Sequence, residues 1–447
     1  MKKSIIFFSI FSLLITSCNK KLDLTPSTSV AEDEVFTSDA NIKAALNGAY
    51  DAASSSTLLG GDLLLYSELL GADEEIQWVG TYNQPREIFN KAILTNNSFV
   101  TDTWDNAYKT INICNNIIKA IDIVDETDRD RVKGEALFLR GVMYFELVTL
   151  YAKPYSAGNV ESNPGVQIVL TPTSGNITEA NYVARSSVKE TFDQVLADLK
   201  DAKSLLPTEN GVYATTYAAS AFLSRVYLQM EDYANARDEA NTVIEDGGFE
   251  LTSTYDKAFN NTVNSTEDIF AIQVSDKDGS NDMHLFWSIP EYSGRDGDVD
   301  VEQKHIDLYE SSDARLALFY IDDQDIYRSG KWKLNYKNLP IVRLGEMYLT
   351  RAECNFRLST DTGATPEEDI NDVIRARVGL DPITIDLDNI IKERHLELAH
   401  EGQRIQDIKR LKESVDGFDY DANELVFPIP VREVNASNGA LTQNPGY

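Results

Sequence analysis

A pair of helices joined by a tight turn, over 217–245, constrains the fold more than any other stretch. Its sequence is YAASAFLSRVYLQMEDYANARDEANTVIE. Apolar residues recur at helical spacing on both sides of a turn at Glu231 and Asp232, which predicts two helices with apolar faces. Before the turn they are Ala221, Leu223, Val226, Tyr227 and Met230, and after it Tyr233, Ala236, Ala240, Val243 and Ile244. Gly247 and Gly248 end the second helix, as expected of a helix C-terminus.

The spacing within this helix pair is close to the tetratricopeptide pattern and recurs along the chain. A small residue precedes a tyrosine by three positions at Gly141 and Tyr144, at Ser224 and Tyr227, and at Gly345 and Tyr348, and Trp104, Ala107, Tyr108 and Ile111 form a degenerate fourth copy. One such pair cannot bury its apolar face, so several must stack. The alternative is that any packed helix pair favours this spacing. Three copies, each opening a hairpin-like segment, favour a repeat scaffold.

The charge balance excludes one class of partner. The chain has 447 residues with 72 Asp and Glu against 41 Lys and Arg, a net charge of −31. Such a surface repels phosphate backbones, so we expect no nucleic-acid binding. The acids are spread through the chain and indicate a solvated surface rather than a particular partner.

The N-terminus predicts export and lipid anchoring. Lys2 and Lys3 precede the apolar run 5–15, which is too short to span a bilayer as a mature helix. The ending ITSC at 15–18 resembles a bacterial lipobox, so we expect a signal peptide over 1–17, acylation of Cys18 and a polar tether over 18–30. Plain secretion is the alternative. The rest, 31–447, reads as a single domain.

The two remaining cysteines do not form a disulfide framework. Cys114 and Cys354 both fall in apolar helical patterns. They could pair in an oxidising compartment, but distant single cysteines are more often buried free thiols.

Hydrophobic periodicity divides the chain into helices and two irregular insertions. The insertions cover about 71–95 and 250–337, and the second is rich in aromatic residues. Long irregular stretches in a repeat protein usually carry function. Helices are predicted over 31–52, 99–123, 128–151, 186–205, 341–358, 366–377 and 390–412, and short strands over 167–170 and 268–274.

Nothing in the sequence indicates catalysis or a cofactor. There is no P-loop, nucleophile elbow or HExxH motif. His395 and His400 lie about 140° apart around a helix, so we do not expect them to bind a metal together. The alternating acids Asp296, Asp298 and Asp300 leave calcium as an alternative, although Val301 stands where an EF-hand loop requires glycine.

Several motifs, in order, resemble one family. They are the lipobox followed by KLDLTP at 21–26, RGVMYFEL at 140–147, YAKP at 151–154, the stretch 220–243, IVRLGEMYLTRAE at 341–353, IRARVGL at 374–380, IKERHLELAHEGQR at 391–404 with Asp407, FPIP at 427–430 and QNPGY at 443–447. The chain resembles the SusD/RagB outer-membrane lipoproteins of Bacteroidetes over nearly its whole length. The charged residues of 393–404 lie three to four apart, so we expect them to form ion pairs with each other and with neighbouring helices, as part of the scaffold.

The resemblance implies a mostly helical fold, a scaffold of tetratricopeptide-like helix pairs with loops and short strands packed on it. It implies a lipid-anchored protein on the outer face of the outer membrane. Such a protein captures oligosaccharides and delivers them to a SusC-like TonB-dependent transporter. No catalysis is implied. The alternative within the family is a peptide-binding subunit of the RagB type.

Sugar recognition needs a flat aromatic face beside groups that satisfy hydroxyls. Both irregular insertions offer this mixture, and we predict that their side chains bind the ligand. The candidates are Asp73, Glu75, Trp78, Tyr82 and Asn83 in the first insertion, and His284, Trp287, Tyr292 and Arg295 in the second, beside Asp296. Trp78 and Trp287 are the first choices, because neither lies on a helical apolar face, although each could instead anchor its loop in the core.

Two further hypotheses come from other functional classes. A tetratricopeptide adaptor would bind only proteins, and a surface glycoside hydrolase would release reducing sugar. The identity of the glycan or peptide does not follow from the sequence.

Overall fold

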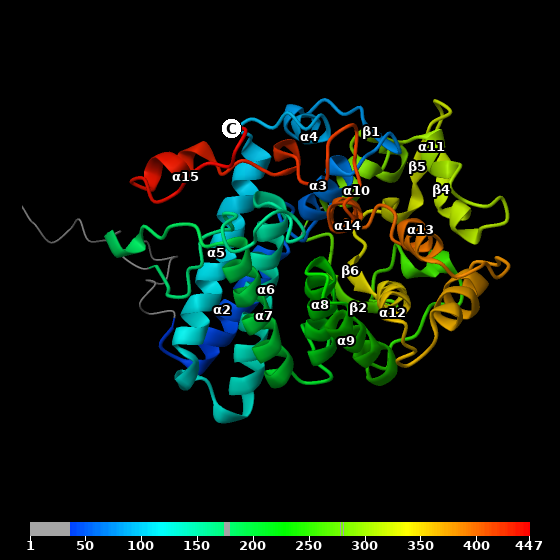
Figure 1. The fold of residues 1–447 in the computed structure, drawn as a ribbon. Helices are drawn as coiled ribbons and strands as arrows, with labels where there is room; N and C mark the ends of the chain where they lie inside the picture. Colours follow the sequence, from blue (N-terminus) through cyan, green and yellow to red (C-terminus); the bar gives the residue numbers. More distant parts are fainter. Residues whose placement is uncertain (1–35, 174–178, 278, 280) are drawn as a thin grey trace, which may run out of the picture.

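The computed structural model describes residues 36–173, 179–277, 279 and 281–447 (Figure 1). Helices dominate, as predicted. They are α2 (Asp39–Ala53), α3 (Asp62–Leu70), α4 (Asn83–Phe89), α5 (Ser98–Lys119), α6 (Glu126–Tyr151), α7 (Val188–Leu205), α8 (Thr216–Gln229), α9 (Tyr233–Asp246), α10 (Asp282–Trp287), α11 (Gln303–Ile306), α12 (Leu344–Leu358), α13 (Leu387–Glu397), α14 (Arg404–Leu411) and α15 (Val431–Ala436). A π-helical segment, Glu368–Arg375, forms the centre of the predicted helix 366–377.

Helices α5 to α9 pack in succession, each on the next, and form a scaffold in which α2, α5, α6 and α7 lie side by side (Figure 1). α5 buries one face, from Val100 through Trp104 and Ala107 to Ile111, at the spacing that the sequence predicts. α6 is buried on all sides from Leu137 to Val148, because α5, α7 and α8 surround it. The predicted helix pair is α8 and α9, with its turn at 230–232.

The small residues of the repeat pattern lie where helices approach. A Cβ atom on Gly141 would stand 3.1 Å from the Leu199 side chain of α7, and the Ser224 hydroxyl donates to Ala236 O of α9 at 3.0 Å. Gly345 lies against Glu397 of α13 instead. The first two contacts fit the predicted helix pairs, and the third joins α12 to a carboxylate.

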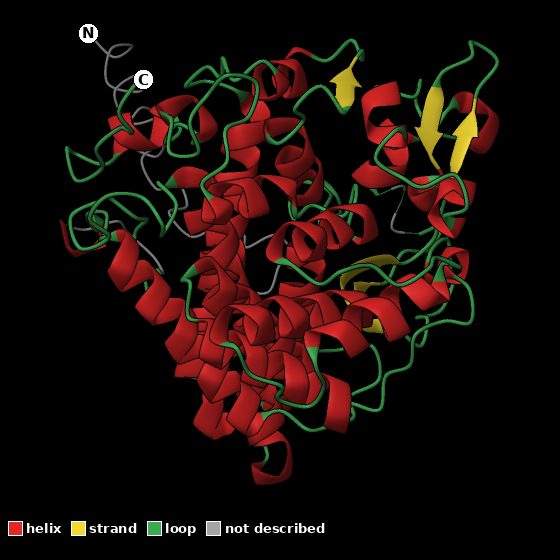
Figure 2. Cartoon of the chain, turned by 45° about the vertical axis from the view of Figure 1, so that its right-hand side comes forward, coloured by secondary structure: helices red, strands yellow, loops and turns green. Residues whose placement is uncertain are grey.

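Two small antiparallel sheets complete the fold. Four strands, β1 (Ile76–Trp78), β3 (Val299–Val301), β5 (Tyr327–Ser329) and β4 (Phe319–Ile321), form one sheet in that order. β1 pairs with β3 in the register Ile76 to Val301, which joins the two irregular insertions. β2 (Asp268–Ile272) and β6 (Leu339–Arg343) form the second sheet. The four-stranded sheet lies at one corner of the molecule, beyond the packed helices (Figure 2).

The main apolar core draws on most of the chain, from Ile42 in α2 to Leu441 near the C-terminus. A smaller core, including Leu349, Ile370 and Ile390, lies beneath α12, α13 and the π-helical segment. The scaffold and the second insertion therefore share one buried interior.

Several predicted elements differ in the structure. Residues 341–343 belong to strand β6, and α12 starts only at Leu344. The helix predicted over 390–412 is broken into α13 and α14, because His400 and Gly402 adopt positive φ. The first described turn of helix 31–52 begins at Asp39, capped by Ser38.

Residues 167–170 form no strand, because side chains satisfy their backbone instead. Tyr108 Oη donates to Gln167 O, and Asn115 Nδ2 donates to Val169 O. Tyr144 Oη lies 2.8 Å from both the N and the O of Val169.

The predicted leader, Cys18 and the tether lie outside the described residues, as does the start of helix 31–52. Within the described part of the chain, no helix combines the length and the apolar character needed to cross a membrane.

Candidate functional site

The loop 288–297 carries two predicted site residues and closes on itself. Gly297 N donates to Ser288 O at 3.0 Å, and Gly294 N donates to Ile289 O at 3.1 Å. A Cβ atom on Gly294 would lie 2.0 Å from Ser288 O, so only glycine fits this close approach. The closed loop therefore holds Tyr292 and Arg295 in set positions.

Tyr82 and Arg295, from the two insertions, stack on one another. The Arg295 guanidinium lies 4.0 Å from the centre of the Tyr82 ring, a cation–π contact. Arg295 also donates to the Thr81 hydroxyl and to Asp298. Tyr82 is 42% exposed, and its edge packs on Phe286 and Phe99. The pair forms a fixed, solvent-facing aromatic and cationic surface.

The two tryptophans that were the first choices for ligand contact are buried, which fits the alternative that each anchors its loop in the core. Trp78 is 4% exposed and Trp287 is fully buried. Trp78 packs on Phe286 and donates from Nε1 to Tyr82 O at 3.2 Å, while Trp287 stacks on His400. Strand pairing and helix packing cover these rings, and Trp78 holds the backbone of Tyr82 through its hydrogen bond.

A second aromatic and cationic cluster involves the same loop. Tyr292 meets Tyr320 edge to face at 5.6 Å, and the Lys333 ammonium lies 4.0 Å from the Tyr292 ring and 4.4 Å from the Tyr320 ring. All three side chains are half-buried. We call Tyr82, Arg295, Tyr292, Tyr320 and Lys333 the aromatic surface.

The other predicted residues lie in different surroundings. Asn83 is exposed at the start of α4, beside Tyr82, and Asp73 is partly exposed and binds Lys304. His284 is buried and contacts Trp332 O through Nδ1, so it cannot reach a surface ligand. Among the predicted residues, Tyr82 and Asn83 are therefore exposed, and Asp73, Tyr292 and Arg295 are partly exposed.

The calcium alternative is not supported by the positions of its acids. Asp298 is buried against Arg295, and Asp300 accepts a hydrogen bond from Arg328 Nη1 at 2.6 Å. The two arginines supply the positive charge that calcium would bring. Burial raises the pKa of both carboxyls, although the neighbouring guanidinium groups oppose this.

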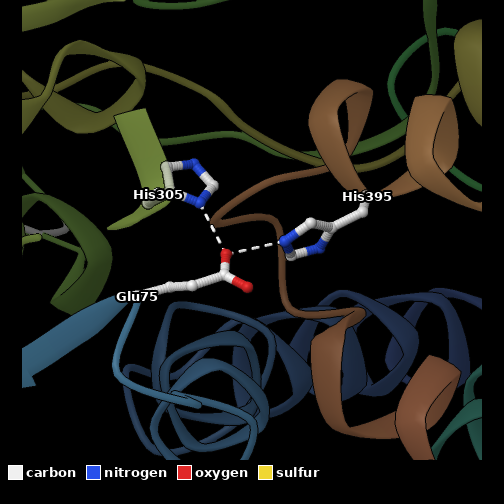
Figure 3. Close-up of side chains that lie close together, drawn as sticks. All are labelled: Glu75, His305 and His395. Atoms are coloured by element: carbon white, nitrogen blue, oxygen red, sulfur yellow. Dashed lines mark hydrogen bonds and ion pairs between the residues drawn. The ribbon is translucent and has the colours of Figure 1, made fainter. Parts of the chain in front are cut away.

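Glu75 is buried and lies between two histidines, a group that the sequence did not predict (Figure 3). Its Oε2 atom is 2.7 Å from His305 Nδ1 and 2.7 Å from His395 Nε2. Burial by itself would raise the pKa of the Glu75 carboxyl, but the hydrogen bonds with the two imidazoles hold it well below its usual range. Burial lowers the pKa of His305.

The charged residues of 393–404 form buried ion pairs, as predicted, but with neighbouring segments rather than with each other. Glu401 binds Arg343 and Lys331, and Arg394 binds Asp407. Glu393 and Glu397 pair with other arginines in the same way. These residues support the fold and do not form a surface site.

Cys114 and Cys354 are both buried and unpaired with each other, which confirms the expectation of free thiols. Burial raises the pKa of the Cys114 thiol to about 12. Burial raises the pKa of the Cys354 thiol as well, so it disfavours the nucleophilic thiolate form of both cysteines.

An open cleft of about 620 Å³ lies on another side of α13. Among its lining residues are Tyr233, Arg357, Ile391, Lys392, His395 and Arg404. The Arg357 guanidinium stacks 4.8 Å from the centre of the Tyr233 ring. The cleft reaches Glu75 and His395 at its inner end.

Comparison with known proteins gives two family models that match separate parts of the chain. A model described as "Starch-binding associating with outer membrane" matches residues 20–228, and the "SusD family" model matches residues 320–426. The chain is 26% identical to "SusD-like protein P2" of Formosa agariphila, over 100% of both chains.

Solved structures share the fold. A SusD superfamily protein from Bacteroides thetaiotaomicron superposes with a TM-score of 0.81 at 24% identity, covering 91% of this chain and 100% of that one. Surface glycan-binding protein A from Bacteroides fluxus superposes with a TM-score of 0.77 at 23% identity, covering 92% of this chain and 100% of that one.

Proposed function

Because the chain belongs to the SusD/RagB family, we infer that it captures oligosaccharides at the cell surface and delivers them to a partner TonB-dependent transporter. Proteins of this family bind their ligands and are not enzymes. One matching family model is described as starch-binding and as associating with the outer membrane, and one structural relative is a surface glycan-binding protein. These descriptions support a carbohydrate ligand and an outer-membrane location.

The aromatic surface is the single observation that carries the proposal. Tyr82 is exposed, its backbone carbonyl accepts a hydrogen bond from Trp78, and the Arg295 guanidinium lies on its ring. Aromatic rings pack against the C–H face of a pyranose, and guanidinium, ammonium and amide groups bind its hydroxyls. Arg295, Lys333 and Asn83 supply those polar groups within the same region. We propose that the ligand contacts Tyr82 and Tyr292, in place of Trp78 and Trp287.

Because this surface carries few aromatic rings, we expect weak binding by the chain alone. A partner that covers the surface would exclude water and strengthen the same contacts. We therefore propose that the transporter completes the site. Anchoring through Cys18 would keep the protein beside that transporter, since acyl chains on one residue hold a protein at the bilayer.

A peptide ligand is the alternative, as in the RagB type. The observation that favours it is the cleft lined by Tyr233, Arg357, Lys392 and Arg404, which offers cationic and apolar groups to an extended chain. A peptide in this cleft would not depend on Tyr82.

The test is calorimetric titration of the purified protein, alone and in complex with the transporter that copurifies from the outer membrane. The panel consists of plant, algal, fungal and host oligosaccharides and a set of mixed peptides. We expect binding of one glycan class, stronger in the complex. Binding of peptides with no glycan binding in either form would replace the proposal with its alternative.

A further inference from the structure

The group formed by Glu75, His305 and His395 has the donor set of a transition-metal site. Its three ligand atoms, one carboxylate oxygen and two imidazole nitrogens, all lie within 4.8 Å of one another. Among the described residues, no other such group of histidine, cysteine and carboxylate side chains occurs. Three of the four histidines of the chain, His305, His395 and His400, meet here around one carboxylate.

The distances are close to those of a zinc site. In a tetrahedral site with bonds of about 2.0–2.1 Å, neighbouring ligand atoms stand roughly 3.3 Å apart. Here the oxygen is 2.7 Å from each nitrogen. Opening each gap by about 0.6 Å, within the reach of side-chain rotation, would admit the ion. Two imidazoles and a carboxylate also match the ligand preferences of zinc rather than those of calcium or magnesium.

The hydrogen bonds behind His305 orient its ring so that Nδ1 faces Glu75. Tyr309 Oη lies 3.1 Å from Leu396 O and 3.3 Å from His305 Nε2. A carbonyl oxygen only accepts, so the single hydroxyl proton goes to Leu396, and His305 Nε2–H must donate to the tyrosine oxygen. Nδ1 is then the ring nitrogen that faces Glu75, and a bound metal would take the place of the proton in the hydrogen bond between Nδ1 and Glu75 Oε2. Metal-bound histidines are usually oriented by such a second hydrogen bond.

The surroundings offer room and a path of entry. A cavity of about 20 Å³ is lined by Glu75, His305, His395 and His400, which is enough for about one water-sized guest. His400 is buried, and neither of its ring nitrogens has a hydrogen-bond partner in the described part of the chain. Glu75 and His395 also line the open cleft, so an ion can reach them from solvent.

We propose that Glu75, His305 and His395 bind one divalent transition-metal ion, with zinc as the best match. The three ligands come from the first insertion, from α11 in the second insertion and from α13. The ion would link both insertions to α13 in the C-terminal part of the fold. Because a metal that binds only the folded state stabilises it, occupancy would also raise the melting temperature.

The test is titration of the full chain, purified in detergent and stripped with a chelator, with Zn²⁺ and separately with Ca²⁺. The wild type is expected to bind one Zn²⁺ per chain and to melt at a higher temperature with Zn²⁺. It is expected not to bind Ca²⁺ at this site. Glu75→Gln and His395→Gln should each weaken Zn²⁺ binding by more than about tenfold. Glu413→Gln is the matched control, because Glu413 lines the same cleft and contacts Arg404 at 4.0 Å but touches no histidine.

X-ray absorption of the zinc-loaded wild type gives a readout that does not depend on any variant folding. Two histidine nitrogens and light oxygen ligands are expected around the ion. The proposal is overturned if the wild type binds no Zn²⁺, if the spectrum shows sulfur ligands or no histidine, or if Glu75→Gln and His395→Gln fold and bind Zn²⁺ as tightly as Glu413→Gln does.

Discussion

The helical scaffold and the second half of the molecule are held together in different ways. Helices α5 to α9 meet through apolar faces, and among them one ion pair is fully buried, Arg140 with Asp198. The segments around β2, β6 and α13 instead bury a network of charges. Its members include Arg315, Lys331, Arg343, Arg375 and Arg377 against Glu267, Asp313, Glu393, Glu397 and Glu401.

The difference follows from backbone regularity. A long helix satisfies its own backbone groups, whereas irregular segments need side chains to do so. At the break between α13 and α14, Lys331 Nζ donates to Ala399 O, and Trp332 Nε1 donates to His400 O. Buried charges of this kind add little net stability, but removing one partner leaves the others unpaired. The network therefore fixes one arrangement of the loops that present the aromatic surface.

The largest expected effect comes from removing the centre of the network. Arg343→Met removes the cation that Glu267, Glu397 and Glu401 share. These three buried carboxylates then keep mainly Arg377 and Lys331. We expect the free energy of unfolding to fall by about 3–5 kcal/mol, measured by urea denaturation. Lys189→Met is the control, because its pair with Asp193 is exposed, and it should change stability by less than about 0.5 kcal/mol. Equal losses of stability in Arg343→Met and Lys189→Met would contradict the role given to the buried network.

The stability contributed by Glu146, a buried acid of the scaffold, should depend on pH in the opposite sense to that contributed by the acids of the network. Burial in α6 raises the pKa of Glu146 to about 7, with only partial compensation from Arg225. Its protonated form is favoured in the fold, so its contribution is present below about pH 4.5 and is lost as pH rises through 7. Glu146→Gln should therefore be more stable than the wild type at pH 8, by an amount on the order of 3 kcal/mol. Urea denaturation at pH 5 and pH 8 measures the difference in stability between Glu146→Gln and the wild type, which should be larger at pH 8.

Asp407, in the charged half, should lose stability in acid. Burial would raise the pKa of its carboxyl, but Arg394 and Arg410 hold it at about 2. Because this lies below the ordinary value of 3.8, the contribution is present above pH 3.8 and is lost as pH falls towards 2. This lowering of the pKa corresponds to about 2 kcal/mol of folding stability. Asp407→Asn should flatten this part of the stability profile, and an unchanged acid slope would refute the assignment.

The smallest effect tests a single contact between repeat helices. Ser224→Ala removes the hydrogen bond from its hydroxyl to Ala236 O, which should cost about 1 kcal/mol by thermal or urea unfolding. Ser204→Ala is the control, since its hydroxyl bonds locally to Asp201 O on an exposed part of α7. A larger loss of stability in Ser204→Ala than in Ser224→Ala would show that the hydrogen bond between α8 and α9 does not account for the effect.

The same comparison explains what the sequence could predict. The mostly helical, SusD-like fold is confirmed, because periodicity in α5 to α9 is local and each apolar face is visible in one segment. The burial of Trp78 could not be predicted from the sequence, because β3 and Phe286, which cover its ring, belong to a distant segment. The break in 390–412 depends on Gly402, where a Cβ atom would collide with Leu64 of α3. Only the fold brings Glu75 to the histidines.

The predicted surface residues show the same limit. Composition and loop position identified Tyr82, Tyr292 and Arg295 as candidates, but the stacking of Arg295 on Tyr82 depends on pairing of the two insertions. Ligand contact by these residues stays a prediction, as does acylation at Cys18.

The most direct test of the account is glycan affinity of the tyrosine variants, measured by calorimetry on whichever glycan the panel identifies. Tyr82→Ala and Tyr292→Ala should each weaken binding by about tenfold or more. Tyr213→Ala should not, although Tyr213 is 40% exposed and also packs on an aromatic ring, that of Tyr50. Undiminished affinity in both Tyr82→Ala and Tyr292→Ala, or an equal loss in Tyr213→Ala, would contradict a binding site on the aromatic surface.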